Sequence, residues 1–221
     1  MTDTSAPEVA ALGILGGSFD PIHHGHLRLA EEAIEGLGLA RVLLIPARPW
    51  QRPTAASAGQ RLRMVELACA GNPRLHAEAL ELQRPGPSYT VETLKVLRER
   101  HGHATPLWLV LGADAFLRLP TWHAWTGLPA LCNLAIVPRP GIDIAAHLPA
   151  ELRDWWSRRS AARTTSAAGA LTLLDAPQLE ISATAIRAMV RAGRSPRYLL
   201  PDCVLDYIEF EGLYTQEGHG A

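Results

Sequence analysis

The chain has 221 residues, near the upper end of the range for one domain, and its 21 Lys and Arg against 22 Asp and Glu give a formal net charge of −1. This balance argues against a general binder of nucleic acid or membrane surfaces, because both need a large positive field. Hydrophobic residues make up 48%, enough for a substantial core, but no apolar run approaches the roughly 20 residues of a membrane span. Three widely spaced cysteines and an N-terminus without a basic or long apolar segment predict a cytoplasmic protein without a disulfide framework.

Strands and helices are expected to alternate along the chain. Short apolar runs predict strands over residues 11–15, 41–45, 75–82, 107–111, 134–137 and 171–174. Apolar residues at helical spacing predict one helix that begins near Gly25. The same spacing predicts four more helices, over residues 61–70, 90–100, 182–192 and 201–211. This order is typical of parallel strands joined by crossover helices. The sequence therefore predicts the α/β class, a doubly wound, mostly parallel open sheet with helices on both faces.

The whole chain, residues 1–221, is expected to form a single domain. Residues 142–175 are rich in Ala, Arg and Ser and predict an irregular insertion, partly helical around residues 150–160. This stretch is too short to bury a core of its own. Residues 182–214 predict a helical C-terminal part.

The turn between the first strand and the first helix carries the strongest functional signal. In such sheets, ligands bind beyond the carboxyl ends of the strands, and glycines there let a ligand approach the backbone. Main-chain N–H groups at the turn and at the helix start predict an anion site, and neutral or charged imidazoles can donate to phosphate oxygens. Gly25, between two of the histidines, is expected to leave room for a phosphate. The candidate phosphate-binding residues here are Gly16, Gly17, Ser18, Phe19, His23 and His26.

Other interpretations of this turn stay open. A Gly-Gly pair before a helix is common in proteins that bind nothing there. The histidines could bind zinc, although the nearest carboxylate is Asp20 and no cysteine is close. A lysine-bearing P-loop is excluded, because Lys95 is the only lysine and follows a leucine. No GxGxxG fingerprint of dinucleotide binding is present.

A second helix start, near residue 182, combines hydroxyl groups with a guanidinium. Ser182 and Thr184 precede an apolar helical pattern, and Arg187 follows one turn into the helix. The simplest interpretation is an N-cap and an ordinary helix. The alternative is a site for a leaving pyrophosphate, which N–H groups, a hydroxyl and a guanidinium can hold together. We expect this turn to face the histidine turn.

These motifs together resemble a known family. His-x-Gly-His after Gly-Gly-Ser-Phe-Asp-Pro resembles the signature of the nucleotidyltransferase superfamily. Within that superfamily the chain is similar to the bacterial nicotinate-nucleotide adenylyltransferases from about Leu12 to Tyr214. The further motifs that carry the similarity are, in chain order, Ser88-Tyr89-Thr90-Val91-Glu92-Thr93-Leu94, Leu111-Gly112-Ala113-Asp114, Thr121-Trp122-His123 and Ile181-Ser182-Ala183-Thr184-Ala185-Ile186-Arg187.

The resemblance implies a reaction in NAD biosynthesis. Nicotinate mononucleotide attacks ATP directly, in line and without a covalent enzyme intermediate, giving nicotinate adenine dinucleotide and pyrophosphate. His23, His26 and Arg187 would be the catalytic residues, because they would stabilise charge on the ATP phosphates. Mg²⁺ would be held mostly by the ATP phosphates and water, without named protein ligands. The residues expected to bind ATP are Gly16, Gly17, Ser18, Phe19, His23, His26, Gly112, Asp114, Ser182, Thr184 and Arg187.

A second group of residues is expected, by the same resemblance, to bind the mononucleotide. Main-chain N–H groups around Tyr89 and Thr90 would receive the pyridine carboxylate, and a helix N-terminus favours a carboxylate over a carboxamide. Trp122 would stack on the pyridine ring, Arg139 would reach a phosphate, and Ser18 would contribute from the first turn. Trp125 is interpreted as packing only.

Two departures from the family pattern affect single positions. Pro49-Trp50-Gln51-Arg52 stands where the family usually has Pro-Pro-His-Lys/Arg, so Arg52 keeps a positive charge for a phosphate, while Gln51 replaces the histidine. Ala183 stands where the family has a second serine, and we assign that position no role. The expected partners are small molecules, not nucleic acid or membrane, and the oligomeric state, including a homo-oligomer, is left open.

Three rival functions remain at this stage. Phosphopantetheine adenylyltransferase would share the His-x-Gly-His turn, but it has no reason to carry Ser-Tyr-Thr with the Trp-His segment. A regulatory module could bind nucleotides without turnover. A metal-dependent hydrolase could use the clustered histidines.

Overall fold

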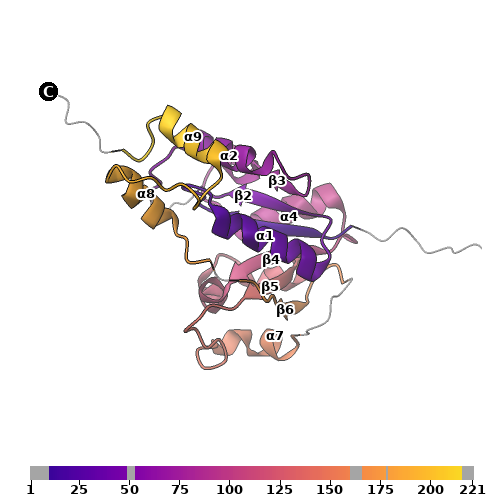
Figure 1. Cartoon of the computed structure of the whole chain (residues 1–221). Helices are drawn as coiled ribbons and strands as arrows, with labels where there is room; N and C mark the ends of the chain where they lie inside the picture. The colour runs from indigo at the N-terminus through magenta and orange to yellow at the C-terminus, as the bar shows by residue number, and fades with distance from the viewer. Residues whose placement is uncertain (1–9, 49–52, 160–165, 178, 216–221) are drawn as a thin grey trace, which may run out of the picture. The chain divides into compact units, whose positions relative to one another are not determined.

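The computed structural model describes residues 10–48, 53–159, 166–177 and 179–215. Six strands form one sheet in the order β3-β2-β1-β4-β5-β6 (Figure 1). The pairs β1–β4, β4–β5 and β5–β6 are parallel. This order is that of the doubly wound sheet whose two halves extend outward from the first strand. The predicted α/β class with a parallel sheet is therefore confirmed.

The contacts divide the chain into two compact units. Unit 1 comprises residues 1–14, 33–42 and 89–175, and unit 2 comprises residues 15–32, 43–88 and 176–221. The strands are β1 (Leu12–Gly17), β2 (Arg41–Pro46), β3 (Leu75–Ala77), β4 (Leu107–Gly112), β5 (Asn133–Val137) and β6 (Leu171–Leu173). The longer helices are α1 (His24–Leu37), α2 (Ala58–Cys69), α4 (Thr90–His101), α8 (Ala183–Arg191) and α9 (Asp202–Phe210).

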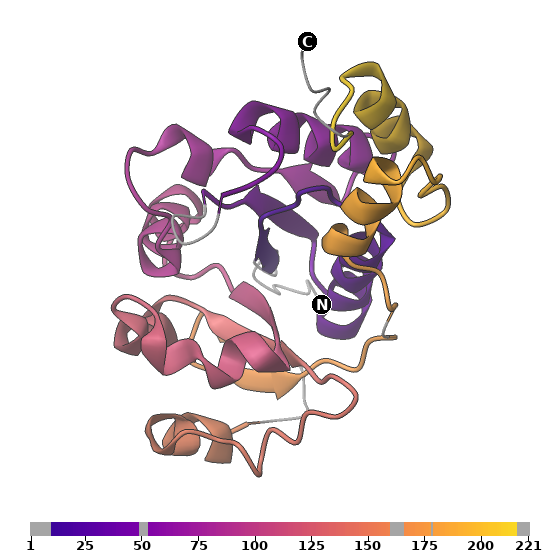
Figure 2. The ribbon, with the colours of Figure 1, turned by 90° about the vertical axis from the view of Figure 1, so that its left-hand side faces the viewer.

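Short helical segments fill the connections. They are α3 (Leu80–Gln83), α5 (Ala113–Leu117), η1 (Leu119–Thr121), η2 (Trp125–Gly127), α6 (Leu128–Leu131), η3 (Ala150–Leu152) and α7 (Arg153–Ser157). The segment from Ala113 to Leu131 was not expected to be helical, because its turns are too short to show a helical period. Within residues 142–175 the predicted helical stretch and late strand are both present, as η3 with α7 and as β6, which lies beside β5 (Figure 2).

One predicted strand is wrong in its second half. Residues 75–82 were expected to form one strand, but β3 ends at Ala77 and α3 begins at Leu80. The Glu78 carboxylate accepts the main-chain N–H of Leu80 at 3.1 Å, which supports a helical turn there. An apolar run of this length fits a strand and a buried helix equally well, so periodicity could not separate them.

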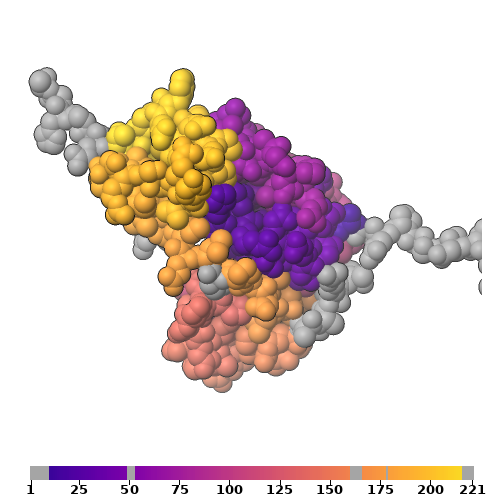
Figure 3. Space-filling view, in the orientation of Figure 1, coloured from indigo at the N-terminus to yellow at the C-terminus, as the bar shows by residue number. Residues whose placement is uncertain are grey.

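Each unit buries its own apolar side chains. In unit 1, every residue of β5 and all of β4 except Gly112 are buried, as expected for central parallel strands. In unit 2, α2 and α9 pack against each other, and the yellow region that includes α9 lies beside purple residues in the space-filling view (Figure 3). None of the helices in the described ranges has the length and apolar character that a membrane crossing requires.

Candidate active site

The turn after β1 is shaped by Phe19. This residue is 1% exposed and has a left-handed backbone with φ of 46°, so the chain reverses sharply while the ring points into the core. The ring meets the His26 imidazole edge-on at 5.0 Å between centroids. A Cβ on Gly17 would lie only 3.0 Å from the same ring, so a larger residue there would crowd the Phe19 ring. Phe19 therefore orients a histidine, a role that the sequence did not predict.

His23 and His26 form a stacked pair. Their ring centroids are 3.7 Å apart and their planes differ by 24°. Burial, with the nearby His24, lowers the pKa of His23 to about 4. Burial, with the nearby His23, lowers the pKa of His26 to about 3. Both imidazoles are therefore neutral at pH 7 in the free protein, and each has one N–H to donate.

Hydrogen bonding selects the donor of His26. Its Nδ1 accepts the main-chain N–H of His23 at 3.3 Å, which leaves the proton of the neutral ring on Nε2. His23 is 6% exposed, and its Nδ1 has no hydrogen-bond partner among the described residues. A buried polar atom of this kind is costly unless a ligand or water satisfies it. The pair thus provides one defined donor and one unsatisfied nitrogen.

The main-chain donors at this turn are fewer than expected. The N–H of His24 donates to the Leu199 carbonyl at 3.0 Å, and that of His26 to the His23 carbonyl at 2.9 Å. Within the described ranges, the N–H groups of Ser18 and Phe19 have no acceptor. The prediction of an anion site here therefore rests on the turn itself and not on the helix start.

Gly25 is in close contact with one of the two histidines. A Cβ at Gly25 would lie 3.1 Å from both Cε1 and Nδ1 of His23. The glycine therefore makes room for the His23 ring, while the expected room for a phosphate stays a prediction.

Two buried charged residues that the sequence did not single out hold the turn. Arg61 on α2 is 1% exposed and donates through Nη1 to the Ser18 carbonyl at 2.6 Å and the Ala47 carbonyl at 2.8 Å. Asp20 is 4% exposed and accepts from the main-chain N–H groups of Ala55 at 2.7 Å and Ala56 at 3.1 Å. No motif spacing could reveal these contacts, because they join residues far apart in the chain.

The second predicted turn lies beside the first. Arg187 of α8 donates from Nη1 to the Asp20 carbonyl at 2.6 Å, and the same nitrogen lies 3.9 Å from Oδ2 of Asp20. Ser182 caps α8, because its Oγ accepts the N–H of Ala185 at 3.1 Å, and Thr184 Oγ1 lies 3.4 Å from Arg187 Nη2. The N-cap interpretation of Ser182 is confirmed, and the same helix brings the Arg187 guanidinium to the turn after β1, while the pyrophosphate site stays a prediction.

In unit 1, the start of α4 presents uncapped main-chain donors. The first N–H groups of a helix have no intrahelical partner, and no side chain caps this helix at Tyr89. The Tyr89 ring stacks on His123, with centroids 4.2 Å apart and planes 27° apart. His123 is exposed, and it is a further residue whose contact was not predicted.

The end of β4 brings two predicted residues together. Arg139 Nη1 lies 3.5 Å from Asp114 Oδ1, and Arg118 Nη2 lies 3.7 Å from Oδ2 of the same carboxylate. A Cβ at Gly112 would lie 3.1 Å from Asp114 Oδ1, so glycine leaves space for the carboxylate. Trp122, which follows η1, and Trp125, at the start of η2, are both half-buried.

The predicted residues thus form two groups. Unit 2 contains Gly16, Gly17, Ser18, Phe19, His23, His26, Ser182, Thr184 and Arg187, and unit 1 contains Tyr89, Thr90, Gly112, Asp114, Trp122 and Arg139. Gln51 and Arg52 lie outside the described residues. Within the described ranges, no three His, Cys, Asp or Glu side chains are grouped in a way that could hold a metal ion.

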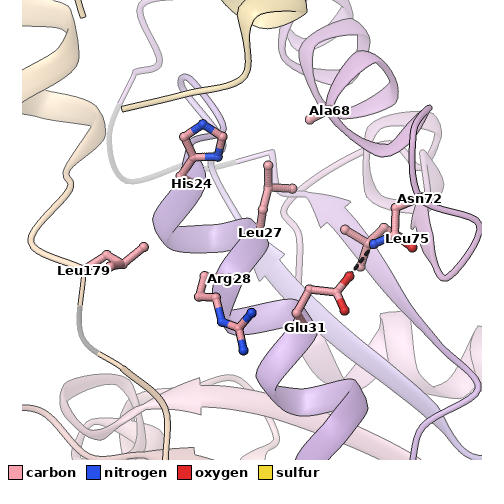
Figure 4. A pocket seen from close by; sticks show the side chains of 8 residues that line it. All are labelled: His24, Leu27, Arg28, Glu31, Ala68, Asn72, Leu75 and Leu179. Atoms are coloured by element: carbon pink, nitrogen blue, oxygen red, sulfur yellow. Dashed lines mark hydrogen bonds between the residues drawn. The ribbon is translucent and has the colours of Figure 1, made fainter. Parts of the chain in front are cut away.

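A pocket of about 350 Å³ lies on another face of α1 (Figure 4). His24, Leu27 and Glu31 line it from the helix, and the Glu31 carboxylate binds Asn72 across it. Glu31 also pairs with Arg74 at 2.9 Å. His23 and His26 do not line this pocket. Adjacent histidines of one helix start therefore have different surroundings, which makes His24 a natural control for the other two.

Known proteins resemble this chain along almost its whole length. The cytidylyltransferase-like family matches residues 14–189. A protein named "probable nicotinate-nucleotide adenylyltransferase" from Acidithiobacillus ferrooxidans is 46% identical over 92% of this chain and 95% of its own. One of the same name from Pseudomonas putida is 44% identical over 96% of this chain and 98% of its own.

Solved structures share the fold. The nicotinic acid mononucleotide adenylyltransferase of Plasmodium falciparum, solved in complex with NaAD, superposes with a TM-score of 0.70 at 19% identity, over 93% of this chain and 97% of its own. A structure described as a "putative nicotinate-nucleotide adenylyltransferase" from Vibrio parahaemolyticus gives a TM-score of 0.61 at 17% identity, over 94% of this chain and 97% of its own.

Proposed function

Because this chain belongs to the cytidylyltransferase-like family and, within it, to the nicotinate-nucleotide adenylyltransferases, we propose that it transfers the adenylyl group of ATP to nicotinate mononucleotide. A phosphate oxygen of the mononucleotide attacks the α-phosphorus of ATP in line. The bond from the α-phosphorus to the bridging oxygen breaks, and its electron pair leaves with pyrophosphate. The products are nicotinate adenine dinucleotide and pyrophosphate, and no covalent enzyme intermediate forms.

The attacking phosphate is already ionised at pH 7, so the reaction needs no general base. The protein has to place two mutually repelling anions and stabilise the charge that develops on the transferred group. The observation that carries the proposal is the arrangement in unit 2, where the stacked His23–His26 pair and Arg187 both adjoin the turn at Asp20.

The histidine pair acts on the α- and β-phosphates. The neutral rings donate N–H groups, and a bound polyanion raises the pKa of each ring, because a nearby negative charge favours the protonated form. Arg187 and the start of α8 receive the leaving pyrophosphate, together with Ser182 and Thr184. The N–H groups of the Gly17–Phe19 turn complete the cradle.

Unit 1 supplies recognition of both nucleotides. The uncapped start of α4 binds the pyridine carboxylate, and Trp122 stacks on the ring. Arg139 contacts a phosphate, which requires that it leave or share its pairing with Asp114, while Gly112 and Asp114 bind the adenosine. Arg52 is a further phosphate contact in this proposal.

Mg²⁺ enters this proposal as an ion carried by ATP. In this proposal the ion is coordinated by phosphate oxygens and water, with no named protein ligand. The ion neutralises phosphate charge when bound. A cytoplasmic location remains part of the proposal.

The direct test is incubation of the protein with ATP, Mg²⁺ and either nicotinate or nicotinamide mononucleotide, with the products identified by mass. We expect nicotinate adenine dinucleotide and pyrophosphate, with nicotinamide mononucleotide turned over less efficiently because its NH₂ group would face N–H donors. Equal kcat/KM for both mononucleotides would contradict the role of the α4 start. Binding without pyrophosphate release would support a regulatory module instead, and turnover of phosphopantetheine would support the related transferase.

A further inference from the structure

Asp20 joins four segments of unit 2 through one buried side chain. Its carboxylate accepts from Ala55 and Ala56, and its Oδ1 also accepts the phenolic O–H of Tyr214 at 2.8 Å. Arg187 approaches both the carbonyl and the carboxylate of the same residue. Four segments therefore meet at Asp20: the turn after β1 (residues 16–26), here called the phosphate turn, the segment before α2, helix α8 and the end of the described chain.

The two contacts of Arg187 with Asp20 differ in length. The Arg187 guanidinium donates to the Asp20 carbonyl at 2.6 Å, but it stays 3.9 Å from the carboxylate oxygen. A full ion pair would bring these atoms within about 3 Å and would turn the guanidinium toward the buried acid. The carboxylate instead accepts from two main-chain N–H groups and one phenol. The guanidinium therefore lies near the negative charge of Asp20 without forming a close ion pair with it.

Tyr214 helps to keep the Asp20 carboxylate satisfied without a close contact from Arg187. It is 8% exposed, and its burial, together with the neighbouring Asp20 carboxylate, raises the pKa of the phenol far above its usual value, so the group remains a donor at any working pH. Removing the O–H would leave Oδ1 of Asp20 with the Ala56 N–H at 3.1 Å as its remaining described donor in a buried site. The Arg187 guanidinium, 3.9 Å from Oδ2, is a charged donor that could then move closer to the acid.

We propose that Asp20 and Tyr214 are positioning residues that set the orientation of the Arg187 guanidinium. This inference rests on the proposed role of Arg187 at the leaving pyrophosphate. Neither Asp20 nor Tyr214 touches substrate: each acts through the arginine. The end of the described chain is thereby part of the catalytic arrangement and not only a cover for α2.

The test is a double-mutant cycle that combines Tyr214→Phe with Arg187→Ala, with kcat, KM for each substrate and thermal unfolding measured for all four proteins. Tyr214→Phe keeps the ring and removes only the O–H. We expect it to lower kcat about tenfold with KM for the mononucleotide unchanged, and to change kcat less than twofold when Arg187 is already alanine. Any loss of thermal stability should be equal in both backgrounds.

Tyr207→Phe, on the neighbouring α9, is the matched control and should leave kcat unchanged. If Arg187→Ala alone leaves kcat unchanged, the proposed role of Arg187 fails and this inference fails with it. If Arg187→Ala lowers kcat but Tyr214→Phe acts equally in both backgrounds, or not at all, the function stands and the positioning role is wrong. Asp20→Asn, which keeps the shape but removes the charge, should reproduce the kcat loss of Tyr214→Phe if it folds.

Discussion

The two units hold their candidate site residues in different ways. In unit 2, three polar residues that form or contact the turn after β1 are buried: Asp20, His23 and Arg61 are 4%, 6% and 1% exposed, and Asp20 and Arg61 each make several hydrogen bonds. In unit 1, the pairs are at the surface: the side chains of Arg139 and Asp114 are 56% and 37% exposed. Charge stabilisation in a transition state requires dipoles that are already oriented, whereas ring recognition tolerates adjustment. In the proposed function, this difference corresponds to chemistry in unit 2 and substrate selection in unit 1.

The largest expected effect is on the histidine pair. We expect His26→Ala to lower kcat at least hundredfold, the scale of losing one oriented donor to developing charge. His24→Ala, which changes a histidine of the same helix start on the pocket side, should keep nearly full turnover. Steady-state kinetics and circular dichroism of both variants measure this. Near-normal turnover of His26→Ala would remove His26 from the chemistry.

A second prediction compares the buried arginine of each unit. Arg98 on α4 is 4% exposed and donates to main-chain carbonyls that include Leu131 at 2.7 Å, as Arg61 does in unit 2. Replacing either by Met leaves buried acceptors unsatisfied, so each variant should lose about 2 kcal/mol or more of unfolding free energy in urea.

Of the two variants, only Arg61→Met should also lower kcat, because Arg61 contacts the phosphate turn and Arg98 contacts carbonyls of unit 1. The measurement is made where both variants are still folded. A fall in kcat for Arg98→Met as large as that for Arg61→Met would argue against the division of roles between the units.

A third prediction concerns recognition in unit 1. Trp122→Ala should raise KM for nicotinate mononucleotide about tenfold, the scale of one aromatic contact, with KM for ATP little changed. Trp125→Ala is the matched control, because Trp125 is also half-buried and is interpreted as packing. It should lower thermal stability without a selective effect on one substrate. If Trp125→Ala selectively raised KM for the mononucleotide and Trp122→Ala did not, Trp125 would be the stacking residue and Trp122 the packing residue.

The smallest expected effect is a pH dependence of stability. Burial holds the folded pKa of His23 at about 4 and that of His26 at about 3, below the usual 6.5. The unfolded chain therefore binds more protons below pH 6.5, and stability is lost as the pH falls from there through the folded pKa values. Between pH 7 and pH 6 the loss should stay below about 1 kcal/mol for each ring.

Urea unfolding of the wild type and of His26→Asn measures this slope, which should be shallower in the variant. Saturating ATP should also flatten it, because phosphate raises the pKa of the rings. An equal slope in wild type and variant would mean that His26 does not titrate as its burial requires.

Much of the fold was predictable from local patterns. Apolar runs identified all six strands, and helical spacing located α1, α2, α4, α8 and α9 to within a few residues. The failure at residues 75–82 has a local cause, because a short apolar run does not distinguish a strand from a buried turn of helix. The short segments between Ala113 and Leu131 lack enough residues for a period to show.

The motif residues were also predictable, but not their states. The sequence located His23 and His26 in one turn and Arg187 at a helix start. It did not show that the rings stack, that burial keeps them neutral, or that Gly25 makes room for one of them. These properties depend on the distance between side chains and on access to solvent, which no local spacing encodes.

Sequence alone determined the order of strands and helices along the chain, the residues of the glycine and histidine motif after β1, and the family, because periodicity and motif spacing are local properties. Tertiary structure decided which distant groups support that turn. The contacts of Asp20 with Ala55, Ala56, Arg187 and Tyr214, and of Arg61 with Ser18, exist only because the fold removes these polar groups from water and leaves them to satisfy one another. The partners of a buried charged group depend on which polar groups the tertiary structure brings within hydrogen-bond distance of it.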